Sequence, residues 1–185
     1  MAQFIIISGA PGSGKTTLIE KILKEITLPV FSKDDFKSLL FETLQLEHTV
    51  ENSKSIGFAS IKILHHLLGQ LKHTQATYII ESAFKPQFAD QLFEKLEQEG
   101  HNMIQLYCYC DIETNMERIT ERVDSQKRDP LHQDHLRLDE FKKAMASGEY
   151  KKLNITKTIE LDTHGEQKMM DEIISNFIKG LLPDG

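Results

Sequence analysis

Short apolar runs alternate with amphipathic stretches along the whole of this chain. Five runs of strand length consist mainly of hydrophobic residues, which predicts β-strands buried on both faces. They cover residues 3–7, 30–32, 77–82, 103–110 and 157–162. In the stretches between them, apolar residues recur every three or four positions. This spacing predicts helices over residues 15–26, 34–44, 53–73, 86–99, 112–123 and 166–178.

Pro86 and Gly100 delimit the fourth predicted helix. Proline favours the first position of a helix and glycine the position just past its end, which is their order here. The residues predicted to face the core from this helix are Phe88, Leu92, Phe93 and Leu96.

Strands that alternate with helices predict one α/β domain over residues 1–185. Parallel strands need crossover connections, so we expect a parallel sheet covered by helices on both faces. The segment 125–154 is polar and weakly patterned, and there we expect a small helical lid, mobile or folded as a hairpin. Ligands of such sheets bind beyond the carboxyl ends of the strands. Candidate functional residues are therefore sought at that edge.

Length and charge narrow the class of protein. A chain of 185 residues fits a single domain. Its 22 basic and 28 acidic residues give a net charge of −6, which argues against binding along an extended nucleic acid. No apolar run approaches the roughly 20 residues of a membrane-spanning helix, and the first residues lack the basic lead-in of a secretory signal. We therefore expect a cytoplasmic protein without membrane contact.

The two cysteines, Cys108 and Cys110, lie in one apolar run. On a strand they point to the same face, and their spacing does not suit a disulfide. A zinc site would need further ligands in register, and none follows. We interpret both as buried thiols rather than as metal ligands.

Residues 9–16 carry the strongest functional signal. The stretch Gly9-Ala10-Pro11-Gly12-Ser13-Gly14-Lys15-Thr16 matches G-x-x-x-x-G-K-[ST] between a predicted strand and a predicted helix. Its glycines let backbone N–H groups surround a polyphosphate, and the helix dipole favours an anion at its N-terminus. We expect this phosphate loop, with Thr17, to bind a nucleoside triphosphate, Lys15 to reach the β- and γ-phosphates, and Thr16 to bind Mg²⁺. A glycine-rich turn without a ligand would leave Lys15 unexplained.

A phosphate loop is shared by kinases, GTPases, motor ATPases and transporters. No guanine-reading N-K-x-D follows a late strand, which argues against a GTPase. The stretch Asp162-Thr163-His164-Gly165 fits D-x-x-G, but it follows the last strand and is interpreted as an accidental match. A kinase is favoured. An ATP-hydrolysing switch or nucleotide-binding module that acts on a protein partner remains the alternative.

Two acidic residues lie at predicted strand ends on the ligand side. Asp34 follows the second strand and Glu81 ends the third. A phosphoryl-transfer enzyme needs one carboxylate to orient or deprotonate the acceptor hydroxyl and another group near the metal. Asp34 could instead be only the N-cap of the next helix, and Glu81 could be a solvent-facing strand end. For Glu81, metal binding and general-base catalysis both stay open.

Basic residues follow at helical spacing. Arg118 and Arg122 are four residues apart and share one side of a predicted helix. Together with Arg128 in the polar segment they could bind nucleotide and neutralise the transferring phosphoryl group, with Arg118 assigned to the nucleotide. A solvated face with weak ion pairs is the alternative. His132 is a weaker candidate for the same role.

Lys37 lies one helical turn beyond Asp34. It could hold a phosphate of the acceptor, or it could be a surface lysine, and both interpretations stay open.

These residues together resemble the small P-loop kinases. The resemblance is carried by the phosphate loop, by Ser32-Lys33-Asp34-Asp35-Phe36-Lys37, by Ile79-Ile80-Glu81-Ser82, and by the arginines with Arg128-Asp129-Pro130-Leu131-His132. The group with polynucleotide 5′-hydroxyl kinases, chloramphenicol phosphotransferases and zeta-toxin-like kinases is the most similar. The resemblance covers residues 1–164.

The resemblance implies a three-layer P-loop NTPase fold with strand order 2-3-1-4-5. It also implies ATP and Mg²⁺, and transfer of the γ-phosphoryl group to a hydroxyl of a small molecule, a nucleoside or a nucleic-acid end. In polynucleotide kinases the residue that matches Asp34 acts on the 5′-hydroxyl, and a basic residue that matches Lys37 holds substrate phosphate. Here that residue is lysine, which lacks the bidentate fork of the usual arginine. The acceptor therefore stays undetermined.

Overall fold

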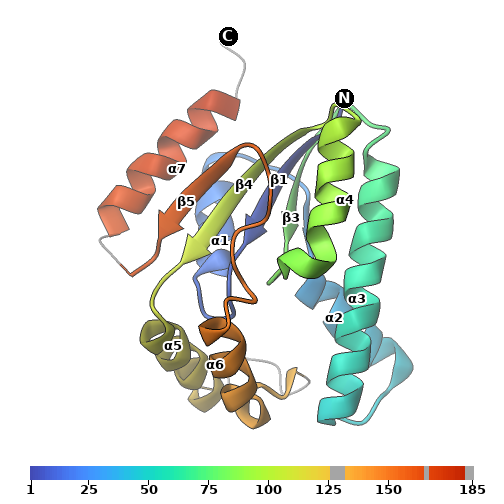
Figure 1. Ribbon diagram of the computed structural model, residues 1–185, viewed down its shortest axis with the longest axis vertical. Coiled ribbons are helices and arrows are strands. Elements are labelled where there is room, and N and C mark those ends of the chain that lie inside the picture. Colours follow the sequence, from blue (N-terminus) through green and yellow to red (C-terminus); the bar gives the residue numbers. More distant parts are fainter. Residues whose placement is uncertain (126–131, 165–166, 182–185) are drawn as a thin grey trace.

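A computed structural model describes residues 1–125, 132–164 and 167–181. Its centre is a parallel five-stranded sheet in the order β2-β3-β1-β4-β5, as the resemblance implied. The strands are β1 (Gln3–Ser8), β2 (Val30–Ser32), β3 (Thr77–Glu81), β4 (Asn102–Tyr109) and β5 (Thr158–Asp162). All four strand pairings are parallel. Because the strands run the same way, their carboxyl ends meet at one edge of the sheet (Figure 1).

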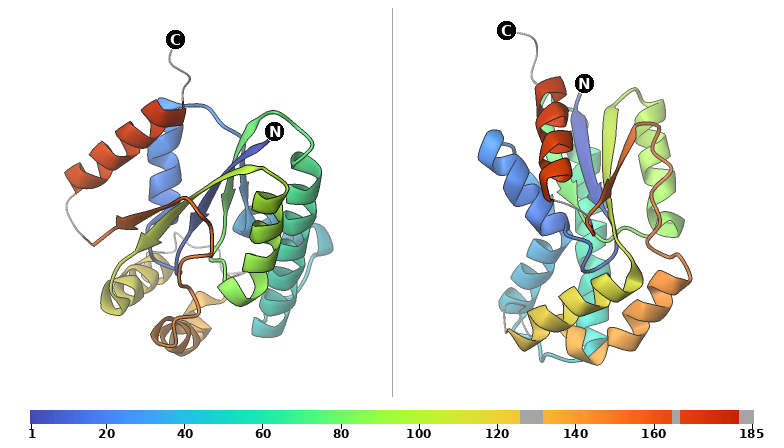
Figure 2. Two further views of the ribbon diagram at one scale, coloured as in Figure 1. Left: turned by 45° about the horizontal axis from the view of Figure 1, so that its top comes forward. Right: turned by 90° about the vertical axis from the view of Figure 1, so that its left-hand side faces the viewer.

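Helices cover both faces of this sheet (Figures 1 and 2). Helices α1 and α7 lie over one face, and α3 and α4 lie over the other. The helices are α1 (Lys15–Glu25), α2 (Lys33–Leu44), α3 (Val50–Leu71), α4 (Pro86–Gln98), α5 (Ile112–Asp124), α6 (Leu138–Ala146) and α7 (Gln167–Leu181). The three-layer α/β arrangement is the one that the alternating pattern predicted.

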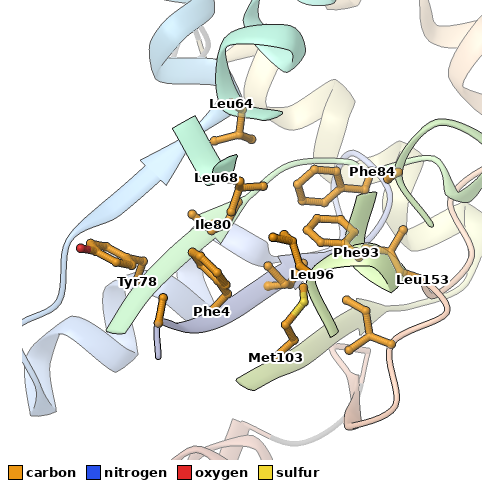
Figure 3. Packing of buried hydrophobic residues seen from close by; sticks show 14 residues of the cluster. Phe4, Leu64, Leu68, Tyr78, Ile80, Phe84, Phe93, Leu96, Met103 and Leu153 are labelled. Atoms are coloured by element: carbon orange, nitrogen blue, oxygen red, sulfur yellow. The ribbon is translucent and has the colours of Figure 1, made fainter. Parts of the chain in front are cut away.

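Alternation along β1 divides the core into two hydrophobic clusters. Phe4 and Ile6 pack with residues of α3 and α4, whereas Ile5 and Ile7 pack with residues of α1 and α7. Successive side chains of a strand point to opposite faces, so a continuous apolar run fills both sides. Figure 3 shows the first cluster. In it the rings of Phe84 and Phe93 pack edge-on, with their centroids 5.3 Å apart.

Some helix boundaries and faces differ from the predictions. Helix α3 begins at Val50 instead of 53, because the Thr49 hydroxyl accepts a hydrogen bond from the Asn52 backbone N–H and caps it. Phe88 on α4 does not face the core and is 68% exposed, whereas Ala89 is buried in its place. Apolar spacing alone overestimated the width of the buried face of α4.

Helices α5 and α6 pack together at the carboxyl edge of the sheet (Figure 1). Within the predicted lid segment, the described residues contain a 3-10 turn (η2, Asp134–Leu136) and helix α6. The segment is thus partly helical where described. Closure of this segment as a lid stays a prediction. Among the described helices, none combines the length and the apolar character needed to cross a bilayer.

Candidate functional site

The phosphate loop connects β1 to α1 at the carboxyl edge of the sheet. Gly12 and Gly14 have left-handed backbone conformations, with φ of 81° and 84°. Only glycine adopts these conformations without a steric cost. A Cβ on Gly12 would also lie 2.5 Å from the Asn115 carbonyl oxygen, so α5 packs directly on the loop. The motif therefore has the backbone turns that its sequence predicted.

Lys15 begins α1 and is buried beneath the loop. Its ammonium group donates hydrogen bonds to the carbonyl oxygens of Gly9 and Ala10, at 3.0 and 2.9 Å. It also lies 3.8 Å from Oε1 of Glu81. Thr16 and Thr17 follow in the first turn of α1 and are exposed. The predicted lysine and hydroxyl groups are therefore all at the N-terminal end of one helix.

Glu81 ends β3 and is only 8% exposed, so the solvent-facing alternative for it is wrong. Its Oε2 accepts a hydrogen bond of 2.7 Å from the Ser32 hydroxyl at the end of β2. A carboxylate buried between a lysine and a hydroxyl donor is held in a defined orientation. The two predicted members Lys15 and Glu81 thus lie side by side.

Asp34 lies in the first turn of α2, half-buried, and its carboxylate is 3.3 Å from the Lys33 ammonium group. The helix begins at Lys33, one residue earlier than predicted, and Ser32 caps it. The Ser32 hydroxyl accepts the hydrogen bond of the Asp34 backbone N–H. The interpretation of Asp34 as the N-cap is therefore wrong.

Burial and mutual charge set the protonation of this group. Burial raises the pKa of Glu81; Lys15 and the Ser32 hydrogen bond oppose that rise, and the negative charge of Asp34 adds to it. Burial lowers the pKa of Lys15, and the negative charge of Glu81 opposes that change. Asp34 and Arg122 also act on the pKa of Lys15, in opposite directions. The predicted site residues Lys15, Asp34, Glu81 and Arg122 therefore share one electrostatic environment.

Lys37 is 2% exposed, so its interpretation as a surface lysine is wrong. Its ammonium group donates to the Ser53 hydroxyl of α3 at 2.6 Å and lies 3.4 Å from Nδ1 of His132. The same hydroxyl donates to the His132 carbonyl oxygen at 3.0 Å. Lys37 thus joins α2, α3 and the segment before α6. Its predicted contact with an acceptor phosphate stays a prediction.

The arginines of α5 lie next to the phosphate loop. The Arg118 guanidinium donates to the Gly12 carbonyl oxygen at 3.4 Å and to the Thr163 carbonyl oxygen at 2.7 Å. Arg122 is half-buried and its Nε donates to the Arg118 carbonyl oxygen at 3.3 Å. Arg118 therefore contacts the phosphate loop, and its nucleotide role stays a prediction. Arg128 lies outside the described residues.

Thr163 and Ser32 are two site residues that the motifs did not identify. Thr163 directly follows β5 and is buried. Its hydroxyl oxygen accepts a hydrogen bond of 3.1 Å from Nη1 of Arg118, and its methyl carbon would lie 3.5 Å from a Cβ on Gly14. It belongs to the D-x-x-G stretch that was interpreted as accidental. The sequence signal that could have identified Thr163 is its position directly after the last strand, at the edge of the sheet where ligands bind. Ser32 was part of a quoted motif but had no predicted role.

The cysteines are free thiols. Cys108 is fully buried, and burial raises its pKa to about 12. Cys110 is only half-buried, which corrects the prediction for that residue. Within the described residues no cluster of three or more His, Cys, Asp or Glu side chains has the arrangement of a metal site.

Similarity to known proteins identifies the family of this chain. The family model described as zeta toxin matches residues 2–154. The chain belongs to the zeta toxin family. No curated protein has a significant sequence match to it. The match covers the phosphate loop, both acidic residues and the arginines, so all the residues placed here except Thr163 fall within the zeta toxin region.

Solved structures place this zeta toxin family member among the P-loop kinases. A candidate kinase from Chloroflexus aurantiacus is 26% identical, with a TM-score of 0.79, over 98% of this chain and 99% of that one. The APS kinase CysC of Mycobacterium tuberculosis, in complex with AMPPNP and APS, has a TM-score of 0.58 at 14% identity over 97% of both chains. The shikimate kinase of Acinetobacter baumannii, in complex with shikimate, has a TM-score of 0.55 at 17% identity over 97% of this chain and 95% of that one. The fold is that of P-loop kinases.

Proposed function

We propose that this protein transfers the γ-phosphoryl group of Mg-ATP to a hydroxyl group of a small molecule, a nucleoside or a nucleic-acid end. The observation that carries the proposal is the close grouping of a phosphate-loop lysine with two acidic side chains. Lys15 lies 3.8 Å from Glu81, and Ser32 links Glu81 to the start of the helix that carries Asp34. A loop that only binds nucleotide needs an acid near the metal, whereas the second acid, Asp34 in the first turn of α2, is available for an acceptor hydroxyl.

The loop residues 9–16 and Lys15 would hold the triphosphate. Backbone N–H groups and the N-terminus of α1 favour an anion there. The Lys15 ammonium group donates to two loop carbonyl oxygens, which hold it beneath the loop. With a triphosphate bound, it would neutralise the charge that develops on the β- and γ-phosphates.

The donors present fit a magnesium ion. The exposed Thr16 hydroxyl and the buried Glu81 carboxylate supply oxygen atoms, and Mg²⁺ takes one or two protein oxygens together with phosphate oxygens and water. Thr16 and Glu81 are the residues that would hold it. When bound, Mg²⁺ neutralises the charge of the triphosphate and orients it.

Asp34 would orient the acceptor hydroxyl or accept its proton. It is half-buried in the first turn of α2, and its negative charge raises the pKa of Glu81 beside it. Two interacting carboxylates do not share the same proton affinity. Asp34, which is the more exposed of the two, is the better placed for an incoming substrate. Glu81 faces Lys15 and the proposed metal instead.

The arginines would stabilise the transferring group from the α5 side. Arg122 acts electrostatically on Lys15, and Arg118 bonds to the loop at Gly12 and to Thr163. A phosphoryl group in transfer spreads its charge over its oxygens, so fixed guanidinium groups lower the barrier. We assign Arg118 to nucleotide binding, and Arg122 with Arg128 to the transferring group.

The acceptor is expected to be small or to be a strand end. The net charge of −6 disfavours an extended nucleic acid. Two of the structural neighbours named above bind small molecules, APS in the APS kinase complex and shikimate in the shikimate kinase complex. A screen with γ-labelled ATP should include nucleosides, oligonucleotide 5′ ends, aminoglycosides, chloramphenicol and amino sugars. Transfer of label to one class supports the proposal, whereas release of inorganic phosphate alone, with no labelled acceptor, contradicts it.

Asp34→Asn tests the catalytic assignment once an acceptor is found. The amide keeps the size of the side chain but loses its capacity to accept a proton. We expect ATP affinity within about threefold of the native protein and a transfer rate at least roughly 100-fold lower, in the range of general-base catalysis. Isothermal calorimetry and the label assay measure the two quantities.

Asp35→Asn is the matched control, because Asp35 is the next carboxylate along α2 and is exposed. It should retain native transfer. Full activity in Asp34→Asn, or an equal loss in both variants, would show that Asp34 does not act on the acceptor.

A further inference from the structure

The Ser32 hydroxyl makes two hydrogen bonds that connect the acidic residues of the site. It donates to Oε2 of Glu81 at 2.7 Å, and it accepts from the Asp34 backbone N–H at 3.2 Å. A serine hydroxyl has a single proton to donate. That proton is directed to Glu81, while an oxygen lone pair holds the first turn of α2.

The backbone places Ser32 for this role. Strand β2 has only three residues and pairs with β3, and Ser32 is the direct register partner of Glu81. A short edge strand has few ladder hydrogen bonds to hold its end in place. The side-chain bond between Ser32 and Glu81 therefore adds a restraint where the chain leaves the sheet and enters α2.

We propose that Ser32 is a positioning residue for phosphoryl transfer, whose hydroxyl fixes the Glu81 carboxylate and the Asp34 segment relative to one another. The inference rests on the proposed function of this site. Lys15, Glu81, Ser32 and Asp34 form a continuous chain of contacts from the phosphate loop to α2. Ser32 would act on the reaction through these two acids, to which its hydroxyl is bonded.

The proposal goes beyond helix capping, and a second cap in the same protein separates the two roles. Thr49 caps α3 in the same way, because its hydroxyl accepts from the Asn52 backbone N–H at 3.1 Å. Thr49 lies at an exposed helix start. Thr49→Ala therefore removes a cap of the same kind without touching Glu81 or Asp34.

The experiment compares Ser32→Ala, Ser32→Thr and Thr49→Ala. The kcat for phosphoryl transfer from ATP is measured with the acceptor that the labelled-ATP screen identifies. ATP affinity is measured by calorimetry, and stability by thermal unfolding. Displacement of catalytic groups by about 1 Å costs up to roughly 100-fold in rate. We expect Ser32→Ala to lower kcat by about 10- to 100-fold with ATP affinity within about threefold of native. Ser32→Thr keeps the hydroxyl and should recover most of kcat, and Thr49→Ala should keep native kcat.

Other combinations of kcat, ATP affinity and stability in these variants would overturn the proposal. If Ser32→Ala keeps kcat within about twofold of native, or if Thr49→Ala loses as much activity for the same drop in stability, Ser32 is only a cap. If ATP affinity falls in step with kcat, Ser32 supports nucleotide binding instead of transfer. Failure of Ser32→Thr to recover activity would also contradict a role for the hydroxyl.

A readout independent of turnover separates this inference from the proposed function. The ¹³C resonance of the Glu81 side-chain carboxyl should shift in Ser32→Ala and stay in place in Thr49→Ala, and hydrogen exchange at the Asp34 amide should be faster only in Ser32→Ala. If the native protein phosphorylates no acceptor but these changes occur, the proposed function fails while the link through Ser32 holds. If the resonance and the exchange rate do not change, the link itself is wrong.

Discussion

Gly12 and Gly14 offer a matched test of how tightly the phosphate loop is packed. Both have nearly the same left-handed conformation, with φ of 81° and 84°. Their surroundings differ. A Cβ on Gly12 would lie 2.5 Å from the Asn115 carbonyl oxygen, which belongs to the backbone of α5. A Cβ on Gly14 would lie 3.5 Å from a Thr163 methyl carbon, an ordinary contact. Alanine at both positions thus separates conformational strain from steric conflict.

The expected loss in the free energy of unfolding follows from these conformations and distances. A left-handed L-residue costs roughly 1–2 kcal/mol, and loss of glycine flexibility in the unfolded chain offsets roughly 0.4–1 kcal/mol of it. We therefore expect Gly14→Ala to lower the free energy of unfolding by about 1 kcal/mol. Gly12→Ala adds a conflict with backbone that cannot rotate away, of the order of 1–3 kcal/mol. Its total loss should be about 3 kcal/mol.

Urea unfolding followed by far-UV circular dichroism measures the difference, since the chain has no tryptophan for fluorescence. With a slope of about 2 kcal/mol per molar urea, the two midpoints should differ by about 1 M. Gly12→Ala should also weaken ATP binding more than Gly14→Ala, because α5 and the loop must move apart. Equal midpoints in the two variants, or a less stable Gly14→Ala, would refute the steric argument.

Two further predictions concern an ion-pair group and the thiols. Glu140 of α6 forms ion pairs with Arg137 and with Lys54 of α3, and these pairs join the two helices. Arg137 and Lys54 thereby lower the pKa of Glu140 to about 2 from its ordinary 4.5. These two ion pairs add stability above pH 4.5 that is lost as pH falls toward 2. Because solvent screens the exposed Glu140 and Lys54 side chains, Glu140→Gln should cost less than about 1 kcal/mol at pH 7 and nothing below pH 2 in chemical unfolding, and a constant difference would contradict this. Burial raises the pKa of both thiols, so at pH 8 a thiol reagent should modify Cys110 slowly and Cys108 only after unfolding. Rapid modification of both in the folded protein would contradict their burial.

The fold was largely predictable because its signals are local. Five apolar runs of strand length separated by amphipathic stretches correspond to the five observed strands. The faces of helices were predicted less well. Phe88 is apolar yet exposed, whereas the small Ala89 is buried, because packing against the sheet selects side chains by shape and direction as well as by hydrophobicity. The start of α3 was missed because a threonine cap, not an apolar residue, begins it.

Lys37 shows the limit of motif reasoning at the site. Its position one turn beyond Asp34 indicated a residue open either to substrate or to solvent. The structure buries it against Ser53 and His132, which are 16 and 95 residues away in the chain. A lysine is rarely fully buried unless it has polar partners. Those partners come from elements whose proximity no local pattern encodes.

The amino-acid sequence by itself determined the phosphate loop, since its turn residues, its lysine and its flanking strand and helix are contiguous and follow local backbone preferences. It also determined the α/β class, which depends on hydrophobic periodicity. Only the tertiary structure decided how the acids and arginines are held. The contact of Ser32 with Glu81 spans 49 residues and that of Arg118 with Thr163 spans 45. Such contacts form because parallel strands bring their carboxyl ends to one edge, and which side chains then meet depends on strand register and packing.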